Sequence, residues 1–339
     1  MKLFSAAKTK INPEVQARHV FSMVAGELAL VEEEYRRQAS SNIQVIDYLG
    51  DYLHSSGGKR VRPALLMLAN FAVGGNAKNE KVIRLATVME MLHTATLVHD
   101  DIIDNADLRR NRPSVNARFG NQTAVLMGDW LYMSAFETSL KERSLKILDI
   151  LTRLTRKMTE GELLQLTALG STEITEETYF DILRRKTAYL FSACCEIGAI
   201  LGGASVQIGE ALRDYGLNLG IAFQLADDLL DFTADTSVLG KASGTDLTEG
   251  KLTLPLILLR NKRPEVKEAL RTVMNDGDYG RISRDHLLDM LSRDGMLDET
   301  RFRAEEYARA ARKHLDVLPE TEYREALGDL PAFVIERNR

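Results

Sequence analysis

The chain has 339 residues, of which 45% are hydrophobic and 27% are charged, so it is long enough to bury a large core and too apolar to be disordered. Its formal net charge of −5 gives no long-range attraction to nucleic acid or anionic lipid, so any anion must be bound by local basic clusters. The two cysteines, Cys194 and Cys195, are adjacent, which excludes a disulfide framework and favours a reducing compartment. We find no apolar run of the roughly 20 residues that a membrane span needs and no signal-peptide pattern at the N-terminus, and we predict a cytoplasmic protein.

Helical periodicity covers most of the chain, and strand patterns are almost absent. Apolar residues recur at helical spacing in four long runs, at residues 14–38, 79–104, 145–169 and 188–206. The last run is apolar on most faces, so we expect it in the middle of a bundle or at a subunit contact. Clusters of Gly, Pro, Asn and Ser that are typical of turns lie at residues 54–63, 73–79, 110–122 and 169–177. No long linker divides the chain, so we predict one all-α domain over residues 1–339 with a central bundle of long helices.

An internal repetition is the most informative feature. The stretch "LVHDDIID" carries Asp100, Asp101 and Asp104, and it recurs as "QLADDLLD" with Asp227, Asp228 and Asp231. On a helix, residues i and i+4 stack on one face and i+1 lies about 100° round, so the three carboxylates of each cluster can converge. A solvated helix end explains one such cluster, but it explains the repetition after two apolar helices less well.

Acidic residues at the C-terminal end of a helix oppose the helix dipole, and a bound cation would offset that cost. The spacing brings no His or Cys to the clusters, and a ligand set made only of oxygens favours Mg²⁺. His99 adjoins the first cluster but projects from another side of the helix, so we expect it to pack or to donate a supporting hydrogen bond.

Local basic groups provide the complementary charge. They are Lys59, Arg60 and Arg62 in "GGKRVRP", Arg109 and Arg110, Lys186 in "RRKTA", and Lys241 and Lys251 in "LGKASGTDLTEGK". Arginine holds diphosphate oxygens with two parallel hydrogen bonds, whereas lysine acts as a point charge. Each group alone is an ordinary surface charge, and "GGKRVRP" lacks the P-loop spacing. In combination with the aspartates they predict two diphosphate sites, one bridged by metal ions and one held by cations alone.

The motifs "GGKRVRP", "DDIID" followed by "RR", "KTA", "FQLADDLLD" and "GKASGTDLTEGKLTLP" occur in this order and resemble the trans-type polyprenyl diphosphate synthases over residues 45–260. The resemblance implies a homodimeric bundle of long, mostly antiparallel α-helices around a deep central cavity. It also implies a prenyltransferase that uses Mg²⁺, with about three ions in each active site. An allylic diphosphate would ionise, isopentenyl diphosphate would attack the cation, and a proton would be lost.

The resemblance also assigns roles to residues at matching positions. Mg²⁺ would be held by Asp100, Asp101, Asp104, Asp227, Asp228 and Asp231. The allylic diphosphate would be contacted by Arg109, Lys186, Thr187, Gln224, Lys241 and Lys251, with Lys186 counted among the catalytic residues. Isopentenyl diphosphate would be bound without metal by Lys59, Arg62, His93 and Arg110.

Two other functions, a terpene cyclase and a non-catalytic subunit, are alternatives to chain elongation. A terpene cyclase of the same chemistry has a second metal motif that usually mixes Asn, Ser or Thr with Glu, so "DDLLD" and "GGKRVRP" favour elongation. A non-catalytic subunit of a heteromeric synthase would be expected to have lost an aspartate cluster, and both clusters are intact.

Product length is predicted from the helix that leads into the first cluster. Thr96 and Ala95 lie four and five residues before Asp100, one turn deeper on the same face. The short-chain enzymes of the resembling family have bulky aromatic residues at this level, so two small residues predict an open path and a product of hexaprenyl to decaprenyl length, with octaprenyl preferred. Trp130, Met133 and Phe136 are candidates for the floor of this path. A close helix crossing would also explain the small side chains.

The primer would be farnesyl or geranylgeranyl diphosphate, and the product would serve quinone side chains. The sequence leaves open whether product release involves transient contact with a membrane.

Overall fold

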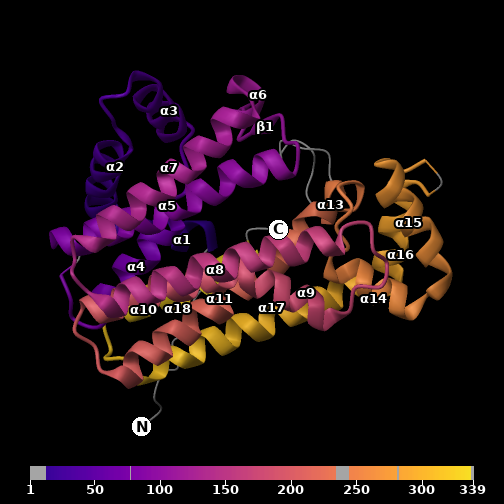
Figure 1. Ribbon diagram of the computed structural model, residues 1–339. Coiled ribbons are helices and arrows are strands. Elements are labelled where there is room, and N and C mark those ends of the chain that lie inside the picture. The colour runs from indigo at the N-terminus through magenta and orange to yellow at the C-terminus, as the bar shows by residue number, and fades with distance from the viewer. Residues whose placement is uncertain (1–12, 77, 234–243, 281, 337–339) are drawn as a thin grey trace, which may run out of the picture.

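The computed structural model describes residues 13–76, 78–233, 244–280 and 282–336. Within these ranges the chain is almost entirely helical (Figure 1). The strands in the described part are β1 (Leu108–Arg109) and β2 (Arg112–Pro113), which pair antiparallel. The all-α prediction is therefore confirmed. Among the described helices, none combines the length and apolar character needed to cross a membrane.

The helices fall into two halves of the chain. Those before residue 170 are α1 (Pro13–Ser22), α2 (Ala25–Ala39), α3 (Gln44–Ser55), α4 (Val61–Ala72), α5 (Glu80–Ile103), α6 (Val115–Phe119), α7 (Asn121–Leu140) and α8 (Leu145–Ala168). Those after it are α9 (Glu176–Leu183), α10 (Tyr189–Leu201), α11 (Val206–Thr233), α13 (Thr245–Thr248), α14 (Leu254–Lys262), α15 (Lys267–Asp276), α16 (Arg284–Arg293), α17 (Met296–Lys313) and α18 (Glu322–Glu336). Shorter turns of other geometry are the π-helix η1 (Arg184–Ala188) and the 3₁₀ helices η2 (Pro264–Val266) and η3 (His314–Val317).

Side-chain caps define where two of the long helices begin. The side chain of Asn79 accepts a hydrogen bond from the backbone N–H of Lys81 at the start of α5, and Ser144 accepts one from Ile147 at the start of α8. Such caps satisfy backbone N–H groups that have no partner within the helix. The predicted helices at 79–104 and 145–169 are thus confirmed, and with 24 residues each they span about 36 Å.

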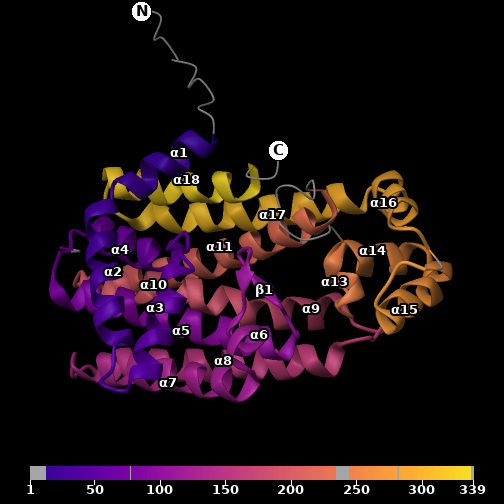
Figure 2. The same cartoon turned by 90° about the horizontal axis from the view of Figure 1, so that it is seen from above.

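The predicted helix at residues 14–38 is wrong in one respect, because the structure breaks it between α1 and α2. The two pieces have different partners: α1 packs on α18, whereas α2 packs on α3 and α5 (Figure 2). The break therefore allows one apolar run to cover two separate surfaces.

Helix α10 lies in the centre of the bundle, as its composition predicts, and packs on α4 and α11. Cys194 and Cys195 are wholly buried in it as free thiols. Helix α11 approaches it so closely that a Cβ added at Gly216 would lie 2.6 Å from the carbonyl oxygen of Phe191. This contact fixes the position of α11 relative to the other core helices.

Helix α11 also joins two apolar clusters. Its first half contributes Leu212 and Tyr215 to the larger cluster, and its second half contributes Leu225 and Leu229 to a smaller one that includes α14 to α16. These last helices form the end of the molecule drawn in orange at the right of Figure 1. The second aspartate cluster lies on the part of α11 that faces this end.

Candidate active site

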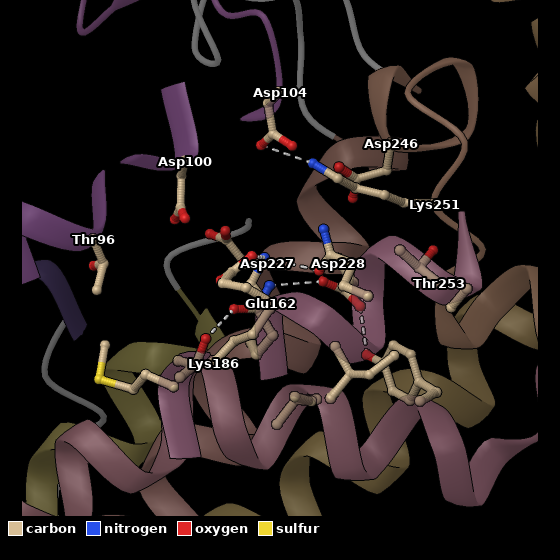
Figure 3. A pocket seen from close by; sticks show the side chains of 18 of the residues that line it. Thr96, Asp100, Asp104, Glu162, Lys186, Asp227, Asp228, Asp246, Lys251 and Thr253 are labelled. Atoms are coloured by element: carbon tan, nitrogen blue, oxygen red, sulfur yellow. Dashed lines mark hydrogen bonds and ion pairs between the residues drawn. The ribbon is translucent and has the colours of Figure 1, made fainter. Parts of the chain in front are cut away.

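A cavity of about 400 Å³ lies between α5, α8, α9, α11 and the segment after α11. Its acidic lining residues are Asp100, Asp104, Glu162, Asp227, Asp228 and Asp246, and its cationic ones are Arg62, Lys186 and Lys251. Figure 3 shows the carboxylates of α5 and those of α11 on opposite sides of the same space. Apolar side chains, among them Leu97, Met158 and Phe223, line the rest of the cavity.

The first cluster contributes two of its three aspartates to this cavity. Asp100 and Asp104 line it, whereas Asp101 is 3% exposed and lies outside it. The carboxylate of Asp101 accepts hydrogen bonds from Nε of Arg109 at 2.7 and 2.9 Å and pairs with Nη2 at 2.7 Å. The expected convergence of all three is therefore corrected: the 100° between adjacent helical residues turns Asp101 toward the β1–β2 hairpin.

The second cluster is divided in the same way. Asp227 and Asp228 line the cavity, but Asp231 accepts hydrogen bonds from the backbone N–H groups of Gly244, Thr245 and Asp246 at 3.2, 3.1 and 3.3 Å. Asp231 thus holds the start of α13 in place instead of joining the other two, which corrects the expected convergence of this cluster as well.

Burial and repulsion between neighbouring carboxylates raise the pKa values of three aspartates in the cavity. Burial, together with the neighbouring Glu162, raises the pKa of Asp100 to about 7. Burial also raises the pKa of Asp228 to about 7, although hydrogen bonds donated by Tyr179 and by Nε2 of Gln224 (2.9 Å) stabilise its charged form. The pKa of Asp246 is raised by burial and by Asp231.

This donor set fits a hard divalent cation, because carboxylate oxygens on both sides of the cavity are the ligands that such ions prefer. Within the described residues, no three Asp, Glu, His or Cys side chains are already close enough to hold an ion between them. Like charges that face each other without a cation repel, which opposes a closer arrangement.

One cationic side chain and one polar side chain reach the cavity from the π-helix η1. The backbone N–H of Tyr189 donates to the carbonyl of Arg184, five residues earlier, and this wider turn brings both Lys186 and Thr187 to the lining. Nζ of Lys186 lies 2.8 Å from Glu162 and donates to Gln165 at 2.9 Å. π-Helical turns inside longer helices occur frequently at functional sites.

Lys251 is the cation on the other side of the cavity. Its Nζ donates to Asp104 at 3.1 Å and to Glu249 at 2.9 Å, and it therefore bridges α5 to the segment after α13 (Figure 3). Gln224, predicted from the sequence, also lines the cavity and accepts a hydrogen bond from Thr187 at 2.9 Å. Lys241 lies outside the described residues.

A second, larger cavity of about 970 Å³ adjoins the first. Lys59, Arg62, His93 and Arg110, which were predicted to bind one diphosphate together, all line it. Arg62 and His93 also line the first cavity, so the two cavities share a wall. Burial lowers the pKa of Arg62, and burial with the nearby arginines lowers that of His93. Nε of Arg62 is buried and has no hydrogen-bond partner among the described residues.

Arg109 is not where the sequence placed it. It was predicted to contact the same diphosphate as Lys186, but it pairs with Asp101 and lines neither of the two cavities described above. The turn between α5 and β1 explains this, because it folds the chain back so that Arg109 reaches the carboxylate eight residues before it. In that turn the backbone N–H of Ala106 donates to the carbonyl of Asp101 at 2.8 Å.

The two residues predicted to set product length differ in position. Thr96 lines the first cavity, whereas Ala95 is wholly buried and does not line it. Of the candidate floor residues, Trp130 and Phe136 are half-buried, but Met133 is 63% exposed and lies outside the core. His99 packs against α7, with Nε2 3.2 Å from the carbonyl oxygen of Val125, as predicted.

Sequence reasoning missed Glu162, Gln165, Asp246 and Tyr179. Asp246 belongs to "GTDLTEGK", a motif of which only the lysine was predicted to bind a ligand. Its approach to Asp231 depends on the tertiary structure, which residue spacing does not show. Glu162 and Gln165 are three residues apart on α8 and therefore share a helix face, a signal that was available. Tyr179 carries no charge, and nothing local marks it.

A helical bundle in which two acidic helix faces enclose one cavity, beside a cation-lined cavity that shares its wall, defines a class of enzymes that act on two diphosphate esters at once. Residues 43–287 match the family described as Polyprenyl synthetase. The chain belongs to that family, and it is a prenyltransferase with the all-α isoprenoid synthase fold.

Three relatives illustrate the similarity. The octaprenyl diphosphate synthase of Escherichia coli (strain K12) is 42% identical over 320 residues, which are 94% of this chain and 98% of that protein. A polyprenyl synthase from Caulobacter crescentus CB15, solved in complex with calcium and isoprenyl diphosphate, has a TM-score of 0.89 and 37% identity and covers 95% of this chain and 98% of its own. A decaprenyl diphosphate synthase from Rhodobacter capsulatus has the same TM-score and identity, with 95% and 99% covered.

Proposed function

We propose that this chain condenses isopentenyl diphosphate with an allylic primer, farnesyl or geranylgeranyl diphosphate, and repeats the reaction to a long all-trans polyprenyl diphosphate. The observation that carries the proposal is the pair of adjoining cavities that share Arg62 and His93. One is rich in carboxylates and needs a cation to receive an anion, and the other is lined by cations. Two diphosphates held in this way lie side by side with their hydrocarbon ends adjacent.

The acidic cavity is proposed to bind the allylic diphosphate through magnesium. Asp100 and Asp104 on α5 and Asp227 and Asp228 on α11 would hold the ions, which supply charge stabilisation for the departing diphosphate. The calcium in the complex of the Caulobacter relative supports the binding of a divalent cation by proteins of this family. Asp101 and Asp231 are proposed to hold neighbouring segments in place and not to bind the ions. The carboxylate of Asp101 already pairs with Arg109, and that of Asp231 already accepts hydrogen bonds from the start of α13.

The protein's own groups complete the allylic site. Lys186 and Lys251 place positive charge on opposite sides of it, and Thr187 with Gln224 offers hydrogen-bonding groups between them. Charges that are fixed before the reaction stabilise a developing anion without reorganisation. The apolar lining, which includes Leu97, Met158 and Phe223, excludes water that would otherwise capture the allylic cation.

Lys59, Arg62, His93 and Arg110 are proposed to bind isopentenyl diphosphate in the second cavity. Arginine supplies the paired hydrogen bonds that orient a diphosphate, and the shared wall directs the double bond toward the allylic carbon. Positioning of two reactants in this way removes much of the entropic barrier of a bimolecular step.

The preferred product is octaprenyl diphosphate, for a quinone side chain. Thr96 is a small residue in the wall of the allylic cavity below Asp100, so it leaves room for a growing chain. The named products of the Escherichia coli and Rhodobacter capsulatus relatives, octaprenyl and decaprenyl diphosphate, support a long product.

We further propose that residues 1–339 form one domain that acts as a homodimer in the cytoplasm. The contribution of α11 to both apolar clusters supports one domain. The exposed side chains of Val125, Leu126 and Met133 on α7, which are 41%, 68% and 63% exposed, support an interface with a second copy. The free, buried cysteines fit a reducing compartment.

The test is to incubate the purified chain with isopentenyl diphosphate, farnesyl diphosphate and Mg²⁺, and to measure the products by mass spectrometry. Octaprenyl diphosphate is the expected main product. A wild-type protein that leaves isopentenyl diphosphate unconsumed with every primer would overturn the proposal, and release of a cyclic hydrocarbon from the primer alone would favour a cyclase. Light scattering on the eluted protein reports the mass of the assembly.

A further inference from the structure

Arg60 is a partly buried arginine held between two glutamates. Its Nη1 donates to Oε1 of Glu90 at 2.7 Å, its Nη2 donates to Oε2 of Glu32 at 3.0 Å, and its Nε also donates to Glu32. The side chains of Arg60 and Glu90 are 11% and 4% exposed. The guanidinium also lies over the ring of Tyr35, at 5.8 Å from its centroid. Glu32 is on α2 and Glu90 on α5, so Arg60 connects two helices.

The backbone of Arg60 is in the left-handed region, with φ 49° and ψ 37°, immediately before α4. For a residue other than glycine this conformation is unfavourable by about 1–2 kcal/mol, and it persists only where surrounding contacts enforce it. The three hydrogen bonds to Glu32 and Glu90 are contacts of that kind. Lys59 precedes Arg60 and Arg62 follows it by two residues, so the conformation of Arg60 determines where both cations point.

The same cluster also orders the neighbouring arginine turn. A Cβ added at Gly58 would lie 2.9 Å from Nη1 of Arg110 and 3.0 Å from Nη1 of Arg60, so both guanidinium groups pack on this glycine. The negative charge of Glu90 acts on Arg62 and on Arg110, which repel each other. Glu90 therefore offsets part of the repulsion between cations that gather before any diphosphate is present.

We propose that Arg60, clamped by Glu32 and Glu90, is a positioning residue that holds Lys59, Arg62 and Arg110 in the arrangement that receives isopentenyl diphosphate. This rests on the proposed function, in which those three residues bind that substrate. Arg60 lines the same cavity as those three residues, but its Nε, Nη1 and Nη2 all donate to Glu32 or Glu90, so its part is to position the other cations.

The experiment measures binding of isopentenyl diphosphate alone, which cannot react without a primer, by isothermal titration calorimetry. Arg60→Met is expected to raise its Kd tenfold or more, and to raise its KM alike, while kcat and the KM of farnesyl diphosphate stay within twofold of wild type. The matched control is Arg84→Met. Arg84 lies on α5 and, like Arg60, pairs with a buried glutamate, here Glu142, with side chains 17% and 2% exposed, so its loss should lower the unfolding temperature without changing the Kd.

Several outcomes would overturn the inference. One is an Arg60→Met protein that is less stable than wild type and yet has a Kd for isopentenyl diphosphate within twofold of wild type. That result would mean that the ion pairs of Arg60 stabilise the fold and do not position the substrate-binding cations. If that variant does not fold, Glu90→Gln, which keeps the shape of the side chain, decides by the same criterion. Binding that is lost in Arg62→Ala but kept in both of these variants overturns only the inference, whereas a wild-type chain that does not bind isopentenyl diphosphate overturns the proposed function with it.

Discussion

Adjacent aspartates of the first cluster should respond to the same substitution in opposite ways. Asp100 faces other carboxylates and has a pKa raised from 3.8 to about 7 by burial and by Glu162, so its charge opposes folding in the absence of a metal ion. Asp101 has a charged partner in Arg109, so its charge supports folding. We expect Asp100→Asn to stabilise the metal-free protein and Asp101→Asn to destabilise it.

The magnitudes follow from these environments. A pKa raised by about 3 units corresponds to about 4 kcal/mol at a pH above both values. Removal of one partner from a buried ion pair costs about 3–5 kcal/mol, which we reduce to about 2 kcal/mol because solvent screens a partly exposed side chain, and that of Arg109 is 36% exposed. With an unfolding entropy of about 2.1 cal/mol/K per residue, these energies correspond to about +6 °C for Asp100→Asn and about −3 °C for Asp101→Asn.

The assay is thermal unfolding in EDTA, without substrates, at pH 8 and pH 5.5. The carboxyl group of Asp100 takes up a proton more readily in the folded than in the unfolded chain, so its penalty is complete above about pH 7 and decreases as the pH falls toward 3.8. The advantage of Asp100→Asn over wild type should therefore shrink to about half at pH 5.5. Equal destabilisation by both substitutions, or an advantage that grows at low pH, would refute the reasoning.

Three further predictions concern the reaction itself. Arg62→Ala should raise the KM of isopentenyl diphosphate at least tenfold more than that of the primer, and Lys186→Ala should do the reverse; equal changes in steady-state kinetics would contradict separate sites. With farnesyl diphosphate as primer, Thr96→Phe should stop the product at geranylgeranyl length, one condensation on, as mass spectrometry of the products will tell. Ala95→Phe should instead lower stability by about 1–3 kcal/mol in denaturant unfolding, because it overfills a closed core. EDTA should abolish turnover and added Mg²⁺ should restore it, and steady consumption of isopentenyl diphosphate in chelator would exclude a metal-dependent site.

Much of the fold was predictable because it depends on local periodicity. The long helices α5 and α8 follow from runs of apolar residues bounded by capping residues, and the apolar composition of α10 placed it in the core. The break between α1 and α2 was not predictable, because it depends on the distant helix α18 against which α1 packs.

The site was predictable in its residue types and less so in its geometry. Spacing on a helix shows that Asp100 and Asp104 share a face, and both line the cavity. It does not show which neighbour a third carboxylate will meet: Asp101 meets an arginine that the turn after α5 brings back, and Asp231 meets backbone N–H groups more than ten residues further along the chain. Such partners belong to the tertiary structure, and no local pattern reports them.

The π-helical turn η1 determines where this protein tolerates a change in chain length. Deletion of one residue from Arg184–Ala188 would let the segment close into an ordinary α-helix, because the π-helical turn holds one residue more than an α-helical turn. The helices on both sides would keep nearly their present orientation, but the wide turn that brings both Lys186 and Thr187 to the cavity would be lost. The partly exposed turn at 202–205 joins α10 to α11 through residues that are not helical and do not line the cavity, so it can shorten without moving a side chain of the site. A library of single-residue deletions should therefore contain active members at that turn and none within η1.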